Sequence, residues 1–289
     1  MRMKRFAKAI YNFLPLKKQL FLAIRRFGVP SRRIYQHLHF KGDFTVRIDQ
    51  TSSFHIRHYG FEMENDLFWG GIDRGSEKTA LRMWCELVGK ASVIFDVGAN
   101  TGIYSLAAKA LSPNAKLIAI EPVHRVFEKL VVNCWLNNFD ISCIEAALSD
   151  EDGEATLFDF PGEHSYSSTF HKEIFGELDL VETQVKVVRL DTLVNEYQID
   201  KIDLMKIDVE GHEADVLRGF GDCLERFKPT ILIEVLSDEV GASIDKILSE
   251  YNYTYYYVDE TRSEVIKVDE LTRRESLNYI VCSAINSKC

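Results

Sequence analysis

Residues 93 to 105 constrain the fold of this chain more than any other stretch. They read Val-Ile-Phe-Asp-Val-Gly-Ala-Asn-Thr-Gly-Ile-Tyr-Ser, and four of the first five are apolar, which suits a strand buried on both faces of a parallel sheet. Gly98 and Gly102 permit a sharp turn and the close approach of a ligand to main-chain atoms. The stretch therefore predicts a strand, a tight glycine loop and a helix whose N-terminal amides face a ligand.

The spacing of the glycines excludes a dinucleotide fingerprint. When Gly-x-Gly-x-x-Gly is aligned from Gly98, Asn100 and Ile103 stand where the second and third glycines belong. The segment reads instead Asp-x-Gly-x-Asn-x-Gly from Asp96 to Gly102, an acidic variant that suits a ligand with an ammonium group and no pyrophosphate. S-adenosylmethionine is such a ligand, and a corner that binds nothing is the alternative.

A second acid follows at a matching distance. Residues 117–120 read as the next buried strand, which ends at Glu121, and an acid there commonly holds both hydroxyls of a ribose. Glu121 follows Gly98 by 23 positions (121 − 98), close to the roughly 20 expected of this acid. A plain surface carboxylate is the alternative. The predicted cofactor-binding residues are Asp96, Gly98, Ala99, Asn100, Gly102, Glu121 and, near the end of the third predicted strand, Ala147.

Three segments, in order, carry a family resemblance. Residues 95–102 read Phe-Asp-Val-Gly-Ala-Asn-Thr-Gly, residues 120–122 read Ile-Glu-Pro, and residues 206–213 read Lys-Ile-Asp-Val-Glu-Gly-His-Glu. Together they resemble the FkbM family of S-adenosylmethionine-dependent methyltransferases over roughly residues 60 to 285. The resemblance implies an α/β class I methyltransferase fold, whose Rossmann-like sheet is mostly parallel with an antiparallel edge strand. It also implies O-methylation of a hydroxyl on a sugar, glycolipid or polyketide-like acceptor.

Acidic residues recur where the predicted strands end, which is where open α/β sheets bind their ligands. Crowded carboxylates raise one another's pKa unless a positive charge offsets them. A sulfonium, a ligand ammonium, a metal ion or Lys206 would each supply that charge. The acids at these strand ends are Asp96, Glu121, Asp208, Glu210 and Glu234.

Methyl transfer to a hydroxyl calls for a base that removes the hydroxyl proton, an effect worth ~10² to 10⁴ in rate. The candidates are Asp208, Glu210 and His212, because alternate residues of an irregular loop can face one pocket. We expect Asp208 to lie near the reacting hydroxyl, and Glu210 and His212 to act as base or substrate ligands. His212 has the ordinary pKa best matched to a base at neutral pH. A histidine that only caps the following helix is the alternative.

Other chemistry stays open at this stage. Asp208 and Glu234 would sit at adjacent strand ends, as the acids that hold magnesium do in catechol-type O-methyltransferases, and oxygen ligands suit Mg²⁺ or Mn²⁺. A neutral amine acceptor needs no strong base, so an N-methyltransferase is a second reading. A non-catalytic, membrane-associated scaffold with the same fold is a third.

The first 42 residues differ in charge from the rest of the chain. They hold eleven Lys and Arg and no Asp or Glu, although the whole chain has a formal net charge of −9. Residues 1–39 interleave these cations with apolar residues, which predicts a cationic amphipathic helix. The helix would lie on an anionic membrane or pack on an acidic face of its own domain. Its apolar runs are too short to span a bilayer, and we expect no secretion signal and no nucleic-acid binding.

The composition predicts one large α/β core, since 46% of the 289 residues are hydrophobic. We expect a basic extension over residues 1–42, a strand, loop and helix over 43–90, and an S-adenosylmethionine-binding domain over 91–289. Residues 61–73 are predicted as a lid with Glu64, Trp69 and Glu77 facing a small-molecule, glycan or lipid-linked substrate; a clamp over the sheet edge is the alternative. Six cysteines without a Cys-x-x-Cys pair predict free thiols, no zinc site and a cytoplasmic location.

Hydrophobic periodicity places the remaining elements. Helices are predicted over residues 76–88 with Ser76 as its cap, and over 101–111, 125–137, 213–219 and 242–250. A short strand or hairpin is predicted over 43–58, and strands over 141–148, 155–160, 185–190, 202–207, 230–233, 253–258 and 278–284. The last two strands would form the antiparallel edge pair, and residues 164–169 a polar turn or a substrate-contacting loop.

Overall fold

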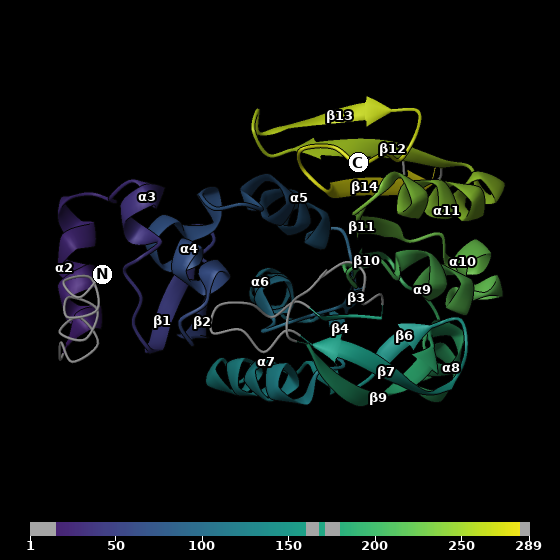
Figure 1. The fold of residues 1–289 in the computed structure, drawn as a ribbon, viewed down its shortest axis with the longest axis horizontal. Coiled ribbons are helices and arrows are strands. Elements are labelled where there is room, and N and C mark those ends of the chain that lie inside the picture. Colours follow the sequence, from purple (N-terminus) through teal and green to yellow (C-terminus); the bar gives the residue numbers. More distant parts are fainter. Residues whose placement is uncertain (1–15, 160–167, 171–179, 284–289) are drawn as a thin grey trace.

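An eight-stranded sheet forms the centre of the molecule (Figure 1). The computed structural model describes residues 16–159, 168–170 and 180–283. The strand order is β13-β12-β14-β11-β10-β3-β4-β5. These strands are β3 (Val93–Val97), β4 (Lys116–Ile120), β5 (Ser142–Ile144), β10 (Leu204–Ile207), β11 (Thr230–Glu234), β12 (Tyr253–Asp259), β13 (Glu264–Val268) and β14 (Asn278–Ser283).

The direction of the strands confirms the predicted class I methyltransferase sheet. Strands β5, β4, β3, β10 and β11 run parallel to one another. Strand β14 is antiparallel to β11, and β12 is antiparallel to β14, as the predicted edge pair requires. Strand β13, which the sequence analysis did not predict, pairs antiparallel with β12 and extends this edge.

Two hydrophobic cores lie on the two faces of the sheet, because successive strand residues point to opposite sides. On β3, Ile94 belongs to one core and Phe95 to the other. The first core also takes in α5 (Lys78–Val88) and α6 (Ile103–Leu111), and the second takes in α8 (Leu190–Glu196), α9 (Glu213–Phe220) and α11 (Asp238–Leu248). The remaining helices of this part are α7 (His124–Leu136) and α10 (Asp222–Phe227).

A second sheet follows the central one, and it corrects the predicted third strand. Residues 141–148 do not form one strand: β5 stays in the central sheet, and the chain then enters β6 (Ala147–Ser149) of a four-stranded sheet with the order β6-β9-β7-β8. The sequence hides this break, because apolar residues continue on both sides of Glu145, where the chain leaves the central sheet. The other members are β7 (Gly153–Asp159), β8 (Ser168–Thr169) and β9 (Val181–Arg189), which extend the strands predicted over 155–160 and 185–190. Residues 164–167 of the predicted polar loop lie outside the described residues.

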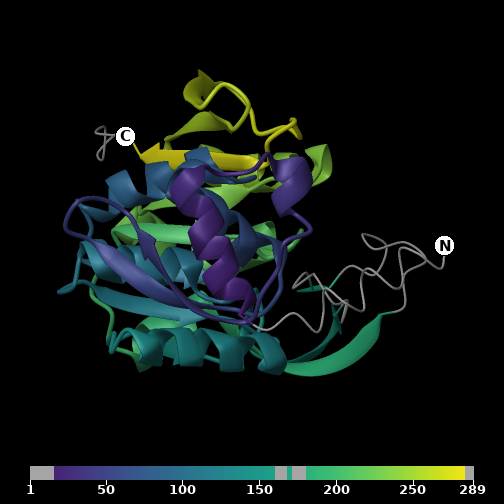
Figure 2. The same cartoon turned by 90° about the vertical axis from the view of Figure 1, so that its left-hand side faces the viewer.

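The N-terminal region packs as a compact layer beside α5 and α6. It consists of α2 (Lys17–Phe27), α3 (Arg32–Tyr35), β1 (Gly42–Arg47), β2 (Ser53–His58), α4 (Glu62–Gly70) and the 3-10 turn η1 (Gly71–Asp73). Strands β1 and β2 form the predicted antiparallel hairpin. Figure 2 shows α2 on the outer surface of this layer.

The predicted lid over residues 61–73 is wrong in its local structure, because most of it is helix α4. Trp69 is 1% exposed and donates its indole N–H to the Leu38 carbonyl, and Glu64 is fully buried. The segment was predicted as a loop because its mixture of acids and aromatics lacks helical periodicity. It is nevertheless helical because its aromatic side chains pack inward, while Asp66 binds Arg32.

Two helix starts also differ from prediction, each because of a cap. Helix α5 begins at Lys78 without a Ser76 cap; the Glu260 carboxylate accepts hydrogen bonds from the main-chain N–H groups of Thr79 and Ala80. Helix α11 begins at Asp238, earlier than expected, where the Ser237 hydroxyl accepts from Val240 N. Among the described helices, none has the length and apolar character that crossing a bilayer requires.

Candidate active site

The loop between β3 and α6 is built on main-chain constraints. Gly98 has φ +75°, and a Cβ on it would stand 1.8 Å from the carbonyl oxygen of Asp208, so no other residue fits there. The N–H groups of Gly98 and Ala99 both donate to the Ile120 carbonyl, which fixes the loop to the end of β4. Asn100 also has a left-handed backbone, with φ 53°. The sequence thus folds into a rigid cradle at the carboxyl end of the sheet.

Glu121 lies beside this loop and is hydrogen-bonded to it. Its Oε2 accepts from Asn100 N at 3.0 Å and its Oε1 from Val123 N at 2.9 Å. Burial raises the pKa of the Glu121 carboxyl to about 7, because these two hydrogen bonds offset only part of the cost of desolvating the charge. A carboxyl in this position therefore changes its charge near neutral pH.

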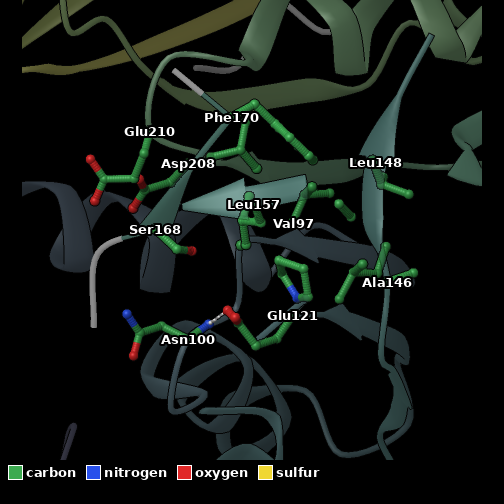
Figure 3. A pocket seen from close by; sticks show the side chains of 15 residues that line it. Val97, Asn100, Glu121, Ala146, Leu148, Leu157, Ser168, Phe170, Asp208 and Glu210 are labelled. Atoms are coloured by element: carbon green, nitrogen blue, oxygen red, sulfur yellow. Dashed lines mark hydrogen bonds between the residues drawn. The ribbon is translucent and has the colours of Figure 1, made fainter. Parts of the chain in front are cut away.

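A cleft of about 600 Å³, part of it open to solvent, lies between this loop and the ends of the neighbouring strands. Figure 3 shows Asp208 and Glu210 together on one side of the cleft, with Asn100 and Glu121 on another. The second sheet closes it with Ala147, Leu157, Ser168 and Phe170.

The predicted cofactor-binding residues divide into two groups. Gly98, Asn100, Glu121 and Ala147 line the cleft. Asp96, Ala99 and Gly102 lie behind that lining in the described structure and shape the loop from beneath. Gly102 has φ +92°, and a Cβ there would come within 2.6 Å of Leu130 Cδ1. Their contact with a cofactor stays a prediction.

Asp96 is fully buried within β3, next to Lys206 of β10. The Ser105 hydroxyl donates to Asp96 Oδ2 at 2.6 Å, which joins β3 to the first turns of α6. Lys206 and Asp96 are paired in the strand register. Burial raises the pKa of the Asp96 carboxyl, although the positive charge of Lys206 opposes that shift.

Lys206 places a positive charge among the acids Asp96, Asp208 and Glu77. Its Nζ donates to Asp208 Oδ2 at 2.7 Å and lies 4.7 Å from the centroid of the Tyr104 ring. Its side chain is only 4% exposed. Burial alone would lower the pKa of Lys206, but the charges of Asp208, Asp96 and Glu77 outweigh that effect and raise it. The sequence analysis named four positive charges that could offset the crowded carboxylates, and the structure shows that Lys206 is one of them.

Glu77, named in the sequence only as part of a lid, reaches this cluster. Its Oε2 accepts from the Tyr104 hydroxyl at 2.8 Å. Burial and the negative charge of Asp208 raise the pKa of the Glu77 carboxyl. Glu234 behaves in the same way: burial first, and then the charge of Asp208, raise its pKa. Three carboxyls from distant parts of the chain thus face one another at the ends of neighbouring elements.

A second cavity, of about 320 Å³ including space open to solvent, lies on the Glu77 side of the cluster. It is bounded by α4, η1 and the first turns of α5 and α6. Glu77 and Tyr104 lie in its wall, together with Asp66 and Arg74. The apolar part of its lining consists of Met63, Leu67, Ile72, Leu81 and Ile103. Tyr104, a residue of the quoted glycine-loop segment, was not singled out from the sequence.

His212 takes a different place from the other two candidate bases. Asp208 and Glu210 line the cleft, but the described part of its lining does not include His212. The Nε2 atom of His212 is 2.9 Å from the Ser149 hydroxyl, and Nδ1 is 3.1 Å from Asp215 Oδ2. Its ring packs against Phe170, with 4.6 Å between the centroids. His212 also stands at the N-cap position of α9, without a side-chain cap.

Two further features of the site are Glu213 and the metal pair predicted from the sequence, Asp208 and Glu234. Glu213 lies in the first turn of α9. Its Oε1 accepts from the N–H groups of Val209 and Gly211, and burial raises its pKa to about 7. Within the described ranges, no group of three or more His, Cys, Asp or Glu residues is arranged to hold a metal ion. Asp208, half of the alternative metal pair with Glu234, contacts the Lys206 ammonium.

Comparison with known proteins places the chain among methyltransferases. Residues 96–255 match the family model described as a methyltransferase FkbM domain. The chain is also similar to AMB antimetabolite synthetase AmbE of Pseudomonas aeruginosa, at 27% identity over 53% of this chain and only 9% of that protein's length.

Two shorter relatives match over a larger share of their own length. The hexuronic acid methyltransferase AglP of Haloferax volcanii is 26% identical over 63% of this chain and 72% of its own length. The 31-O-demethyl-FK506 methyltransferase FkbM of Streptomyces tacrolimicus is 30% identical over 45% of this chain and 60% of its own length.

Proposed function

This chain belongs to the FkbM family of methyltransferases, and we propose that it methylates a hydroxyl oxygen of a sugar, glycolipid or polyketide-like acceptor. The observation that carries the proposal is the cleft itself. It presents a glycine cradle and a buried carboxyl, Glu121, opposite two further carboxylates, Asp208 and Glu210. The named activities of the relatives on a hexuronic acid and on a 31-O position support an oxygen acceptor.

The cradle fits S-adenosylmethionine by its chemistry. Bound there, the cofactor supplies a methyl group made electrophilic by a sulfonium. Glu121 would accept hydrogen bonds from ribose hydroxyls, and the loop at Gly98 would let the ligand approach main-chain atoms that a side chain would shield. Across the cleft, Asp208 is already paired with Lys206, and the carboxylate of Glu210 complements a positive charge, which favours a cationic ligand over a phosphate.

We assign the proton transfer to Asp208. Its carboxylate lines the cleft, and the Lys206 ammonium, which donates to Oδ2 at 2.7 Å, holds it in place. An ionised carboxylate can accept the proton of the acceptor hydroxyl while the oxygen attacks. Glu210, on the same side of the cleft, would hold a neighbouring acceptor hydroxyl. His212 would act through Phe170, by fixing the wall that this ring forms.

The acceptor would reach Asp208 from the second cavity. Glu77 and Tyr104 form part of that cavity's wall and also interact with the Lys206–Asp208 pair. The cavity combines an apolar lining with Asp66, Arg74 and Glu77, which suits an acceptor that carries both hydroxyls and an apolar part. Glu77 is therefore the further residue that we place on the acceptor side.

The test is methyl transfer from labelled S-adenosylmethionine to a panel of monosaccharides, hexuronic acids, glycolipids and polyketide lactones, with the product bond identified by mass spectrometry and NMR. We expect an O-methyl product, and a fall of ~10² to 10⁴ in the rate constant for Asp208→Asn with cofactor affinity retained. The matched control is Asp269→Asn, which changes an exposed carboxylate beyond β13. An N-methyl product, or an unchanged rate for Asp208→Asn, would contradict the proposal.

A further inference from the structure

We propose that the outward face of α2 is a docking site for an anionic lipid surface. This face carries Leu16, Leu20, Ala23 and Phe27, here called the α2 stripe. Leu16 is 68% exposed, Leu20 is 51% exposed and Phe27 is 95% exposed. The spacing i, i+3, i+7 of Leu20, Ala23 and Phe27 places these three residues along one side of α2, and Leu16 directly precedes the helix. Exposed apolar stripes of this kind mark interaction sites.

The opposite face of α2 anchors the helix to its own domain. Phe21 is 2% exposed and packs against Phe40 and Trp69, with ring centroids at 6.4 Å and 5.4 Å. The Lys18 ammonium donates to the Asp43 carbonyl, and the Arg25 guanidinium lies 4.8 Å from the centroid of the Phe68 ring. The helix is thus held mainly by aromatic side chains, and the α2 stripe is presented on a fixed support.

The positive charge around the α2 stripe favours an anionic lipid surface as its partner. Residues 16–42 contain seven Lys and Arg and no Asp or Glu. Arg26, Arg33 and Lys41 are exposed, and Ile34 of α3, 55% exposed, adds a further apolar side chain to the same layer. An apolar stripe rimmed by cations is typical of a helix that lies in the interface of an anionic membrane. A hydrophobic surface on a partner protein would not call for this excess of positive charge.

Nearby acids cancel the charge of Arg32 but not that of the exposed Arg26, Arg33 and Lys41 in the described structure. Glu62 and Asp66 of α4 both bind Arg32, and Asp43 binds Arg57. Helix α2 is 11 residues long, so it would lie on the membrane and not cross it. The proposed docking site does not depend on which acceptor the enzyme methylates.

The experiment is co-sedimentation of the full chain with phosphatidylcholine vesicles that contain or lack phosphatidylglycerol. We expect binding to the anionic vesicles that weakens at high salt, because surface charges are screened. The double variant Leu20→Asp with Phe27→Asp should bind at least about tenfold more weakly. The control is Trp135→Asp, which places one negative charge on an aromatic residue of α7 that is 76% exposed.

Each alternative occupant of the stripe gives its own result. Undiminished vesicle binding by the double variant, or equal loss in Trp135→Asp, would overturn the proposal. If residues 1–15 cover the stripe, the double variant should lower the melting temperature and leave vesicle binding unchanged. If a second copy covers it, the wild type should dimerise and the variant should not, again without a change in vesicle binding. Calorimetric titration with S-adenosylmethionine shows that the variant remains folded, because its cofactor cleft is untouched.

Discussion

The two sides of the cleft are built in different ways. The cofactor side is local in sequence: the loop at Gly98 and Glu121 follow two consecutive strands and are held by main-chain hydrogen bonds. The proposed acceptor side is assembled from segments far apart: the charges of Glu77 and Asp208 act on Lys206, and that of Asp208 acts on Glu234. The first side is therefore fixed by backbone geometry and the second by the balance of buried charges. Substitutions on the two sides should fail for different physical reasons.

The largest effect is expected at Gly98. In Gly98→Ala the new Cβ would meet the Asp208 carbonyl at 1.8 Å, and the left-handed φ of +75° adds strain. We expect the free energy of unfolding to fall by about 3 kcal/mol or more, with loss of cofactor binding. Urea unfolding measures it. Gly71→Ala is the control, since Gly71 has φ +67° with open space around it, so it should cost only the backbone strain, about 1–3 kcal/mol. Equal losses would contradict a steric role for Gly98.

The next effect is expected at Lys206. Lys206→Met leaves Asp208 and Asp96 without their positive neighbour in a buried site, and breaking such a pair costs about 3–5 kcal/mol. Thermal and urea unfolding measure the loss. Lys201→Met removes an ion pair of similar length whose lysine is 51% exposed, and it should cost at most about 1 kcal/mol. If the double variant Lys206→Met with Asp208→Asn is no more stable than Lys206→Met alone, the charge-balance account is wrong.

A smaller effect is expected from the titration of Glu121. The pKa of Glu121 is about 7. If ribose hydroxyls donate to its ionised form, as proposed, the affinity for S-adenosylmethionine should rise by about tenfold from pH 6 to pH 8. Stability changes in the opposite direction. The pKa of Glu121 is raised from 4.5 to about 7 by folding, so its contribution is complete below pH 4.5 and is lost as the pH rises through 7. Calorimetry across this range measures the affinity, and Glu121→Gln should flatten its pH dependence.

The smallest effect is expected at His212. Because its ring is held by Ser149 and Asp215 behind Phe170, His212→Asn should lower the methyl-transfer rate by less than about tenfold. Asp208→Asn is the comparison, with the larger loss given above. A fall for His212→Asn as large as for Asp208→Asn would restore His212 as the base.

The contrast between the two sides also explains what could be predicted from the sequence. The strand, glycine loop and Glu121 were predictable because their constraints lie within one βαβ unit. The break between β5 and β6 was not, since apolar residues stand on both sides of Glu145, where the chain passes from one sheet to the other. The cap of α5 by Glu260 and the approach of Glu77 to Asp208 depend on tertiary contacts that local periodicity does not encode.

The most direct test of the account is a calorimetric titration of the wild type, Glu121→Ala and Asp208→Asn with S-adenosylmethionine. The account predicts saturable binding by the wild type and by Asp208→Asn, and affinity lowered by about 10- to 100-fold in Glu121→Ala, which loses hydrogen bonds to a charged group. Absence of binding by the wild type, or equal affinity in all three proteins, would contradict the assignment of the cofactor to this side of the cleft.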